Sequence, residues 1–193
     1  MASWVQLSIT ALLASSAAAV PLAGHQHHQH SHAKRDGSFQ IQVQNNCQAS
    51  KSVGLFQITP AFDMVSRSGV TNLQPGGTTT IAAPYFDIGM RLSATADQGA
   101  AAQWKPQALF EFGYSSYGGN DGTAYNLSLM NGCPLDTGIA VRPSNPACES
   151  KSCSPGNCAA NQGWTSPTQD SIGSPADTTC YYGPTNFVVT FCP

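Results

Sequence analysis

Short runs in which apolar and polar residues alternate cover much of the chain after residue 38. In "FQIQV", Phe39, Ile41 and Val43 would share one face of a strand, and Gln40 and Gln42 the other. Comparable runs are found at 53–58, 88–95, 108–114, 124–130, 139–143 and 186–191. The pattern predicts a series of short β-strands, each with one buried face.

Clusters of Gly, Pro, Asn and Ser separate these runs, most clearly at 75–77 and 118–122. No segment of convincing length has helical periodicity, and there are no internal repeats. We therefore expect an all-β domain, an antiparallel sandwich or barrel. The segment 144–185 has little strand pattern and is predicted to be a long, cysteine-containing excursion.

The beginning of the chain has the features of a secretory signal peptide. Trp4–Val20 is an apolar run too short to cross a membrane, and Ala17 and Ala19 form an Ala-x-Ala cleavage signature. We interpret residues 1–19 as a signal peptide. The expected product is secreted, with association to a cell wall as a further expectation.

All five histidines lie in the segment that follows, at 25–32, just before the dibasic pair Lys34-Arg35. Clustered imidazoles can bind copper or zinc, so a metal-binding tract is one interpretation. The interpretation that we prefer is a solvated pro-segment, 20–35, removed at the dibasic pair. This leaves 36–193 as one domain of roughly 160 residues, long enough to bury a core.

Charge and composition exclude several classes of function. Eight basic and ten acidic residues give a formal net charge of −2, and no basic patch is present to bind nucleic acid. Nothing after residue 20 is apolar enough to span a bilayer. Because no histidine follows His32, Ser-His-Asp and Cys-His catalysis lack a base, and imidazole-built zinc sites lack ligands. Chemistry would have to come from carboxylates, and the glutamates are Glu111 and Glu149 alone. No metal and no cofactor are expected.

The chain contains seven cysteines, all of them after residue 46, and secretion makes disulfides the default. Cys47 follows the first predicted strand and Cys192 ends the last, so a bridge between them would tie the two ends together. The evenly spaced Cys148, Cys153 and Cys158 could also indicate metal, but no CxxC pair or histidine accompanies them. One of the seven has no intramolecular partner.

Several motifs carry a family resemblance when they are taken in order. They are "FQIQVQNNC", "QPGGTTTI", "ALFEF", "YNLSLMNGCPL", "PACESKSC" and "NFVVTFCP", which together span 39–193. In these motifs the chain resembles thaumatin-like proteins, and in its short length it is similar to the reduced fungal members and the related yeast-phase-specific secreted proteins of fungi. The resemblance implies a thaumatin-like two-sheet antiparallel β-sandwich stabilised by disulfides.

The resemblance also implies a cysteine pairing. Its pairs are Cys47–Cys192, Cys148–Cys180 and Cys153–Cys158. Cys133 stands where the family pattern has an aromatic residue, and it is the candidate for the unpaired thiol.

Members of the family share an acidic cleft associated with binding, and sometimes hydrolysing, β-1,3-glucan. Glu111 matches the family glutamate and Arg91 is the candidate for its arginine. Two family aspartates fall on Asn126 and Asn131. Asp177, with Asp170 as the alternative, would supply the last one. An amide cannot act as a general base, although it can hydrogen-bond to sugar hydroxyls. Glu111 as a plain surface carboxylate, and Arg91 as an ordinary cross-strand partner, remain open alternatives.

Two further features bear on this cleft. Tyr114 and Tyr117 could stack on sugar rings, although turn tyrosines commonly pack on their own loop. Asn126-Leu127-Ser128 is an N-glycosylation sequon, and a glycan on a groove-facing Asn126 would block the groove.

Three hypotheses follow. The preferred one is a secreted, monomeric, non-catalytic protein that binds β-1,3-glucan or another wall polysaccharide. The second is a weak endo-β-1,3-glucanase, with Glu111 as acid and Asp121, Asp136 or Asp177 as its partner. The third is a secreted structural or host-interaction, effector-like protein.

Overall fold

The computed structural model describes residues 37–130, 137–171, 173 and 175–193, all within the unit Arg35–Pro193. The signal-peptide and pro-segment predictions, and those for Asn131 and Cys133, lie outside these residues. The described strands are β1 (Ser38–Asn45), β2 (Lys51–Ile58), β3 (Met64–Ser66), β4 (Thr71–Leu73), β5 (Thr78–Pro84), β6 (Met90–Ser93), β7 (Leu109–Tyr117), β8 (Asn120–Ser128), β9 (Ile139–Pro143), β10 (Lys151–Cys153), β11 (Thr178–Cys180) and β12 (Phe187–Phe191).

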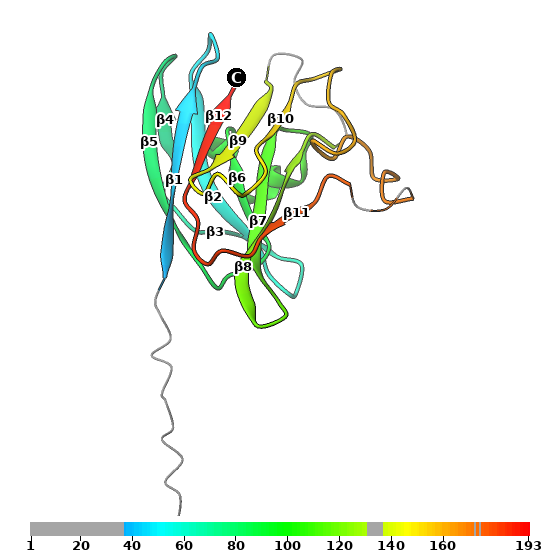
Figure 1. The fold of residues 1–193 in the computed structure, drawn as a ribbon. Helices are drawn as coiled ribbons and strands as arrows, with labels where there is room; N and C mark the ends of the chain where they lie inside the picture. Colours follow the sequence, from blue (N-terminus) through cyan, green and yellow to red (C-terminus); the bar gives the residue numbers. More distant parts are fainter. Residues whose placement is uncertain (1–36, 131–136, 172, 174) are drawn as a thin grey trace, which may run out of the picture. The chain divides into compact units, whose positions relative to one another are not determined.

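These strands form two sheets (Figure 1). One has the order β10-β9-β12-β1-β5. The other has the order β11-β8-β7-β6-β2-β3, with β4 paired to β2 at the opposite end of that strand. The pairing is antiparallel except between β1 and β12, which run parallel. The last strand of the chain therefore lies in the middle of its sheet, between β1 and β9.

Alternation along the strands explains which faces are buried. In β1, Phe39, Ile41 and Val43 are buried while Gln40 and Gln42 are exposed. Apolar side chains from both sheets meet between them in one core, as in a sandwich. Its centre is aromatic, since Phe187 lies 5.6 Å from Phe39, 5.2 Å from Phe110 and 5.2 Å from Tyr125 between ring centroids. Such contacts stabilise aromatic pairs beyond the burial of their area.

Between the described cysteines there are three disulfides: Cys47–Cys192, Cys148–Cys180 and Cys153–Cys158. They are the pairs that the family resemblance implies. Disulfides of this number are typical of proteins that fold in an oxidising compartment, which indicates a secreted protein. In the part of the chain that is described, no helix is long and apolar enough to span a membrane.

Two short 3₁₀-helices, η1 (Ala96–Gln98) and η2 (Ala100–Trp104), are not predicted by the sequence pattern. They follow β6 and contact β2 and β3. Gly54 makes this close approach feasible, because a Cβ there would lie 2.7 Å from the Cβ of Ala96. The segment 144–185 also differs from the prediction, since it contributes β10 and β11 to the sheet edges.

Candidate functional site

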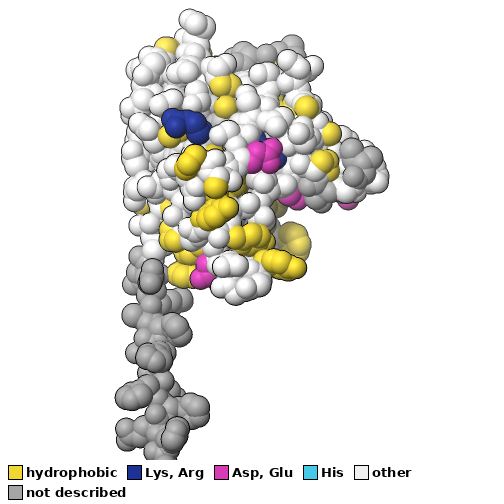
Figure 2. All heavy atoms as spheres, viewed as in Figure 1, with side chains coloured by type: hydrophobic (Ala, Val, Ile, Leu, Met, Phe, Trp, Pro, Cys, Tyr) yellow, Lys and Arg dark blue, Asp and Glu magenta, His cyan; other side chains and the backbone are white. Residues whose placement is uncertain are grey.

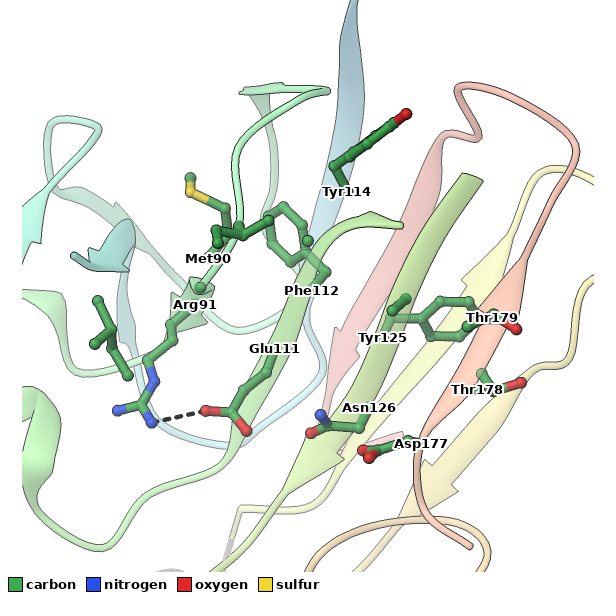
Figure 3. A pocket seen from close by; sticks show the side chains of 15 residues that line it. Met90, Arg91, Glu111, Phe112, Tyr114, Tyr125, Asn126, Asp177, Thr178 and Thr179 are labelled. Atoms are coloured by element: carbon green, nitrogen blue, oxygen red, sulfur yellow. Dashed lines mark ion pairs between the residues drawn. The ribbon is translucent and has the colours of Figure 1, made fainter. Parts of the chain in front are cut away.

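A groove of about 620 Å³ lies on the face of the β6–β7–β8 sheet that points away from the core (Figure 3). Glu111 lies between the buried Phe110 and Phe112, so alternation turns its side chain to this outer face. The same alternation places Asn126 there, between Tyr125 and Leu127. The groove is lined by Ile58, Ile88, Gly89, Met90, Arg91, Glu111, Phe112, Gly113, Tyr114, Ala124, Tyr125, Asn126, Asp177, Thr178 and Thr179.

Four polar side chains form a row across the strands, which we call the polar row: Arg91, Glu111, Asn126 and Asp177. Arg91 pairs with Glu111 in the β6–β7 register, and Glu111 pairs with Asn126 in the β7–β8 register. Asp177 directly precedes Thr178, whose partner on β8 is Tyr125. Figure 3 shows Glu111, Asn126 and Asp177 in succession, with Arg91 beyond Glu111. The structure therefore brings together four of the residues that the sequence indicates.

Arg91 is held on both sides. One of its terminal nitrogens forms an ion pair with Glu111 at 2.8 Å, with the side chains only 13% and 19% exposed. The other donates a hydrogen bond to the carbonyl oxygen of Gln103 at 3.3 Å, and the guanidinium lies 5.2 Å from the ring centroid of Trp104. Because Gln103 and Trp104 come from η2, the unpredicted helix is what positions the arginine.

Burial raises the pKa of Glu111 above its ordinary value, and the nearby charge of Asp177 raises it further, while Arg91 opposes both. A raised carboxyl pKa is what a general acid requires. The ion pair with Arg91 favours the opposite, ionised form. The same residue thus has one property of a catalytic acid and one of a structural or ligand-binding carboxylate.

Asp177 is fixed by Trp164, whose indole nitrogen donates a hydrogen bond to its carboxylate at 2.8 Å. Trp164 extends the sheet beside β8: its backbone nitrogen donates to Leu127 at 2.8 Å, and Leu129 donates to its carbonyl at 2.7 Å. The sequence places Trp164 in a loop-like segment and gives no signal for this role.

Asn126 stands between the two carboxylates. Its amide oxygen is buried and has no hydrogen-bond partner among the described residues. A buried acceptor of this kind is destabilising unless water or a ligand hydroxyl reaches it. The side chain faces the groove, so a glycan attached there would fill the groove.

The two tyrosines differ. Tyr114 lies at one end of the groove, and its hydroxyl donates a hydrogen bond to Asp121 at 2.6 Å. Tyr117 is 76% exposed, contacts the ring of Tyr181 and is not among the lining residues. It lies six residues beyond Glu111 along β7, about 20 Å at the strand rise, which is too far to share the polar row.

Among the described carboxylates, only Glu111 and Asp177 line the groove. Asp121 and Asp170 are not among its lining residues, and Asp136 and Asn131 lie outside the described residues. Asp177 is two strand positions away, about 10 Å between backbones. Within the described ranges, no group of three or more His, Cys, Asp or Glu side chains could hold a metal ion.

No protein-family model matches the sequence. No curated protein matches it either. Among solved structures, the protein elicitor MoHrip2 from Magnaporthe oryzae is similar over 80% of this chain and 99% of its own, with a TM-score of 0.54 and 20% identity. The thaumatin-like xylanase inhibitor TLXI is similar over 79% of this chain and 99% of its own, with a TM-score of 0.47 and 14% identity.

At 20% identity the first likeness describes the fold, and it spans nearly the whole of that elicitor. The two sheets, their mostly antiparallel order and the three disulfides match the architecture expected from the sequence resemblance. The chain has a thaumatin-like fold.

Proposed function

We propose that this chain is a secreted, non-catalytic, monomeric protein that binds a wall polysaccharide, β-1,3-glucan, in the groove. The observation that carries the proposal is the polar row, in which an amide, Asn126, separates Glu111 from Asp177. The row offers both donors and acceptors to sugar hydroxyls at the floor of an open groove.

The surface favours a ligand that is recognised by hydrogen bonds and stacking rather than by net charge. Charged residues make up 9% of the sequence. On the face seen in Figure 2, charged side chains are few and scattered among uncharged ones. A neutral glucan fits such a surface better than a polyanion as the main ligand of the groove.

Two features argue against hydrolysis by a retaining mechanism. A retaining mechanism needs carboxyl groups about 5–5.5 Å apart, whereas Glu111 and Asp177 belong to positions two strands apart. Asp177 also accepts a hydrogen bond from the indole of Trp164, which occupies one of its carboxylate oxygens. The groove is therefore proposed as a binding site.

The test is sedimentation of the purified domain with insoluble β-1,3-glucan, together with an assay for released reducing sugar. We expect the protein in the pellet and no sugar release. Glu111→Gln should weaken the binding several-fold because it removes the charged partner of Arg91. Asp63→Asn, an exposed carboxylate in the β2–β3 turn, is the matched control and should bind like the wild type.

The raised pKa of Glu111 favours a second candidate, a weak endo-β-1,3-glucanase. This requires reducing sugar to appear in the same assay and to vanish in Glu111→Gln. If the protein stays in the supernatant and releases nothing, the third function, a secreted structural or host-interaction protein, takes precedence. One of the structurally similar proteins, MoHrip2, is a protein elicitor.

A further inference from the structure

A second hollow lies on the other side of Arg91 from the groove. It has a volume of about 180 Å³ and is formed between η2, the start of β7 at Leu109 and the end of β8 at Ser128. We call it the Trp104 pocket. Arg91 lines both hollows, so the pocket and the groove are adjacent.

The charge of the Trp104 pocket is opposite to that of the groove. Its charged lining residues are Arg91 and Lys105, with no Asp or Glu among them, whereas the groove contains Glu111 and Asp177. Arg91 already forms an ion pair with Glu111. Lys105 is exposed and forms no ion pair with any described residue, so its charge is available to an anion.

Trp104 supplies a flat apolar wall. Its side chain is held against the Arg91 guanidinium, and the residue is still 49% exposed. A partly exposed indole that is fixed in place by its neighbours can stack on the apolar face of a sugar ring. A bare inorganic anion would leave this surface unused.

Two buried glutamines of this pocket each have one hydrogen-bonding atom left over. Gln107 accepts hydrogen bonds from the hydroxyls of Ser93 and Thr95, at 2.6 and 2.9 Å, which leaves its amide nitrogen without a partner. Gln103 donates to the carbonyls of Thr95 and Gly99, at 3.4 and 3.1 Å, which leaves its amide oxygen without a partner. The side chains are fixed by these bonds and only 5% and 1% exposed. Both leftover atoms are themselves buried, so the two glutamines contribute a fixed wall to the pocket rather than hydrogen bonds to a ligand.

We propose that the Trp104 pocket binds an acidic sugar, a uronate, of a polysaccharide other than the neutral glucan. The sugar carboxylate pairs with Lys105, and the sugar ring lies on Trp104. This inference goes beyond the proposed function, because the pocket and the groove take chemically different sugars.

The test is titration calorimetry with three probes: oligogalacturonate, its methyl ester, and a neutral β-1,3-glucan oligosaccharide. For the wild type we expect the acid to bind about two- to fivefold tighter than the ester, the gain typical of one partly exposed ion pair. Lys105→Gln should abolish that preference and leave binding of the neutral oligosaccharide unchanged. Arg142→Gln, which removes an exposed charge from β9 in the other sheet, is the control and should keep the preference.

An ester that binds as tightly as the acid, or a preference that survives Lys105→Gln, would overturn the inference. Trp104→Ala gives a second measurement, since it should weaken the acid and the ester alike if the ring stacks there. Because Lys105 is exposed, its substitution should leave the unfolding transition unchanged. Failure of the neutral glucan to bind, with the Lys105-dependent preference intact, would reject the proposed function alone.

Discussion

Asn126→Asp is the substitution that tests the polar row most directly. Asn126 and Glu111 are direct cross-strand partners, so their Cβ atoms lie about 5 Å apart. Two carboxylates at that distance repel each other by about 3 kcal/mol at an effective dielectric constant of about 20. Arg91 already pairs with Glu111 and offsets part of this repulsion, so the figure is an upper one.

The sign of the pH dependence follows from Glu111. The pKa of Glu111 is raised in the folded protein. Protonation of Glu111 therefore stabilises the fold fully at a pH below the ordinary carboxyl pKa, and this stabilisation is lost as the pH rises through the raised pKa of the folded state. A second carboxylate beside it enlarges that loss. We expect Asn126→Asp to be destabilised by up to about 3 kcal/mol near pH 7 and by much less near pH 4, where one of the pair is protonated.

The assay is urea unfolding of the wild type and the variant at both pH values. Asn72→Asp is the matched control, because Asn72 is exposed on β4 and its side-chain oxygen accepts a hydrogen bond from Ser52 that a carboxylate can also accept. Equal stability of Asn126→Asp and wild type at both pH values would refute the placement of Asn126 beside Glu111. The substitution also creates a carboxyl pair near the spacing of a retaining glycosidase, so released reducing sugar is worth measuring in the same preparation.

Three further outcomes are expected. Replacing Cys47 and Cys192 by Ser opens a loop of sequence separation 145. In the chain-entropy model this should lower the free energy of unfolding, measured with urea, by about 5 kcal/mol. A loss below about 1 kcal/mol would contradict the model for this disulfide. Trp164→Phe removes the hydrogen bond to Asp177 and should lower the free energy of unfolding by about 1 kcal/mol. It should also reduce the fraction of protein that sediments with glucan. An unchanged fraction would show that glucan binding does not depend on this hydrogen bond. Burial raises the pKa of Tyr85 to about 12, so ultraviolet difference absorbance should show this phenol ionising late, and its contribution to stability should be lost only at strongly alkaline pH.

The part of the fold that could be predicted consists of the strands in which apolar and polar residues alternate. Phe39, Ile41 and Val43 in β1 and Phe110 and Phe112 in β7 are found on buried faces as alternation requires. The parallel pairing of β1 with β12 could not be predicted from the sequence of either strand. The paired residues lie 146 positions apart, and the local pattern of a strand does not indicate which distant strand it pairs with.

The site was predictable only in part, for a related reason. Alternation indicates that Glu111 and Asn126 face away from the core, and the family resemblance adds Arg91 and Asp177. Neither signal indicates Trp164, whose role depends on a backbone bridge to β8. Short 3₁₀-helices such as η2 lack the length at which helical periodicity becomes visible, so the support that Arg91 receives from it could not be predicted.

The central place of β12 has a consequence for biosynthesis. Until residues near Phe191 leave the ribosome, β1 and β9 each keep a row of unsatisfied backbone groups along the edge that β12 will later fill. Open edges of this kind invite pairing with other chains, so a nascent molecule is prone to aggregation until β12 has been synthesised. A premature stop that removes only this last strand should therefore yield aggregates rather than a smaller working domain.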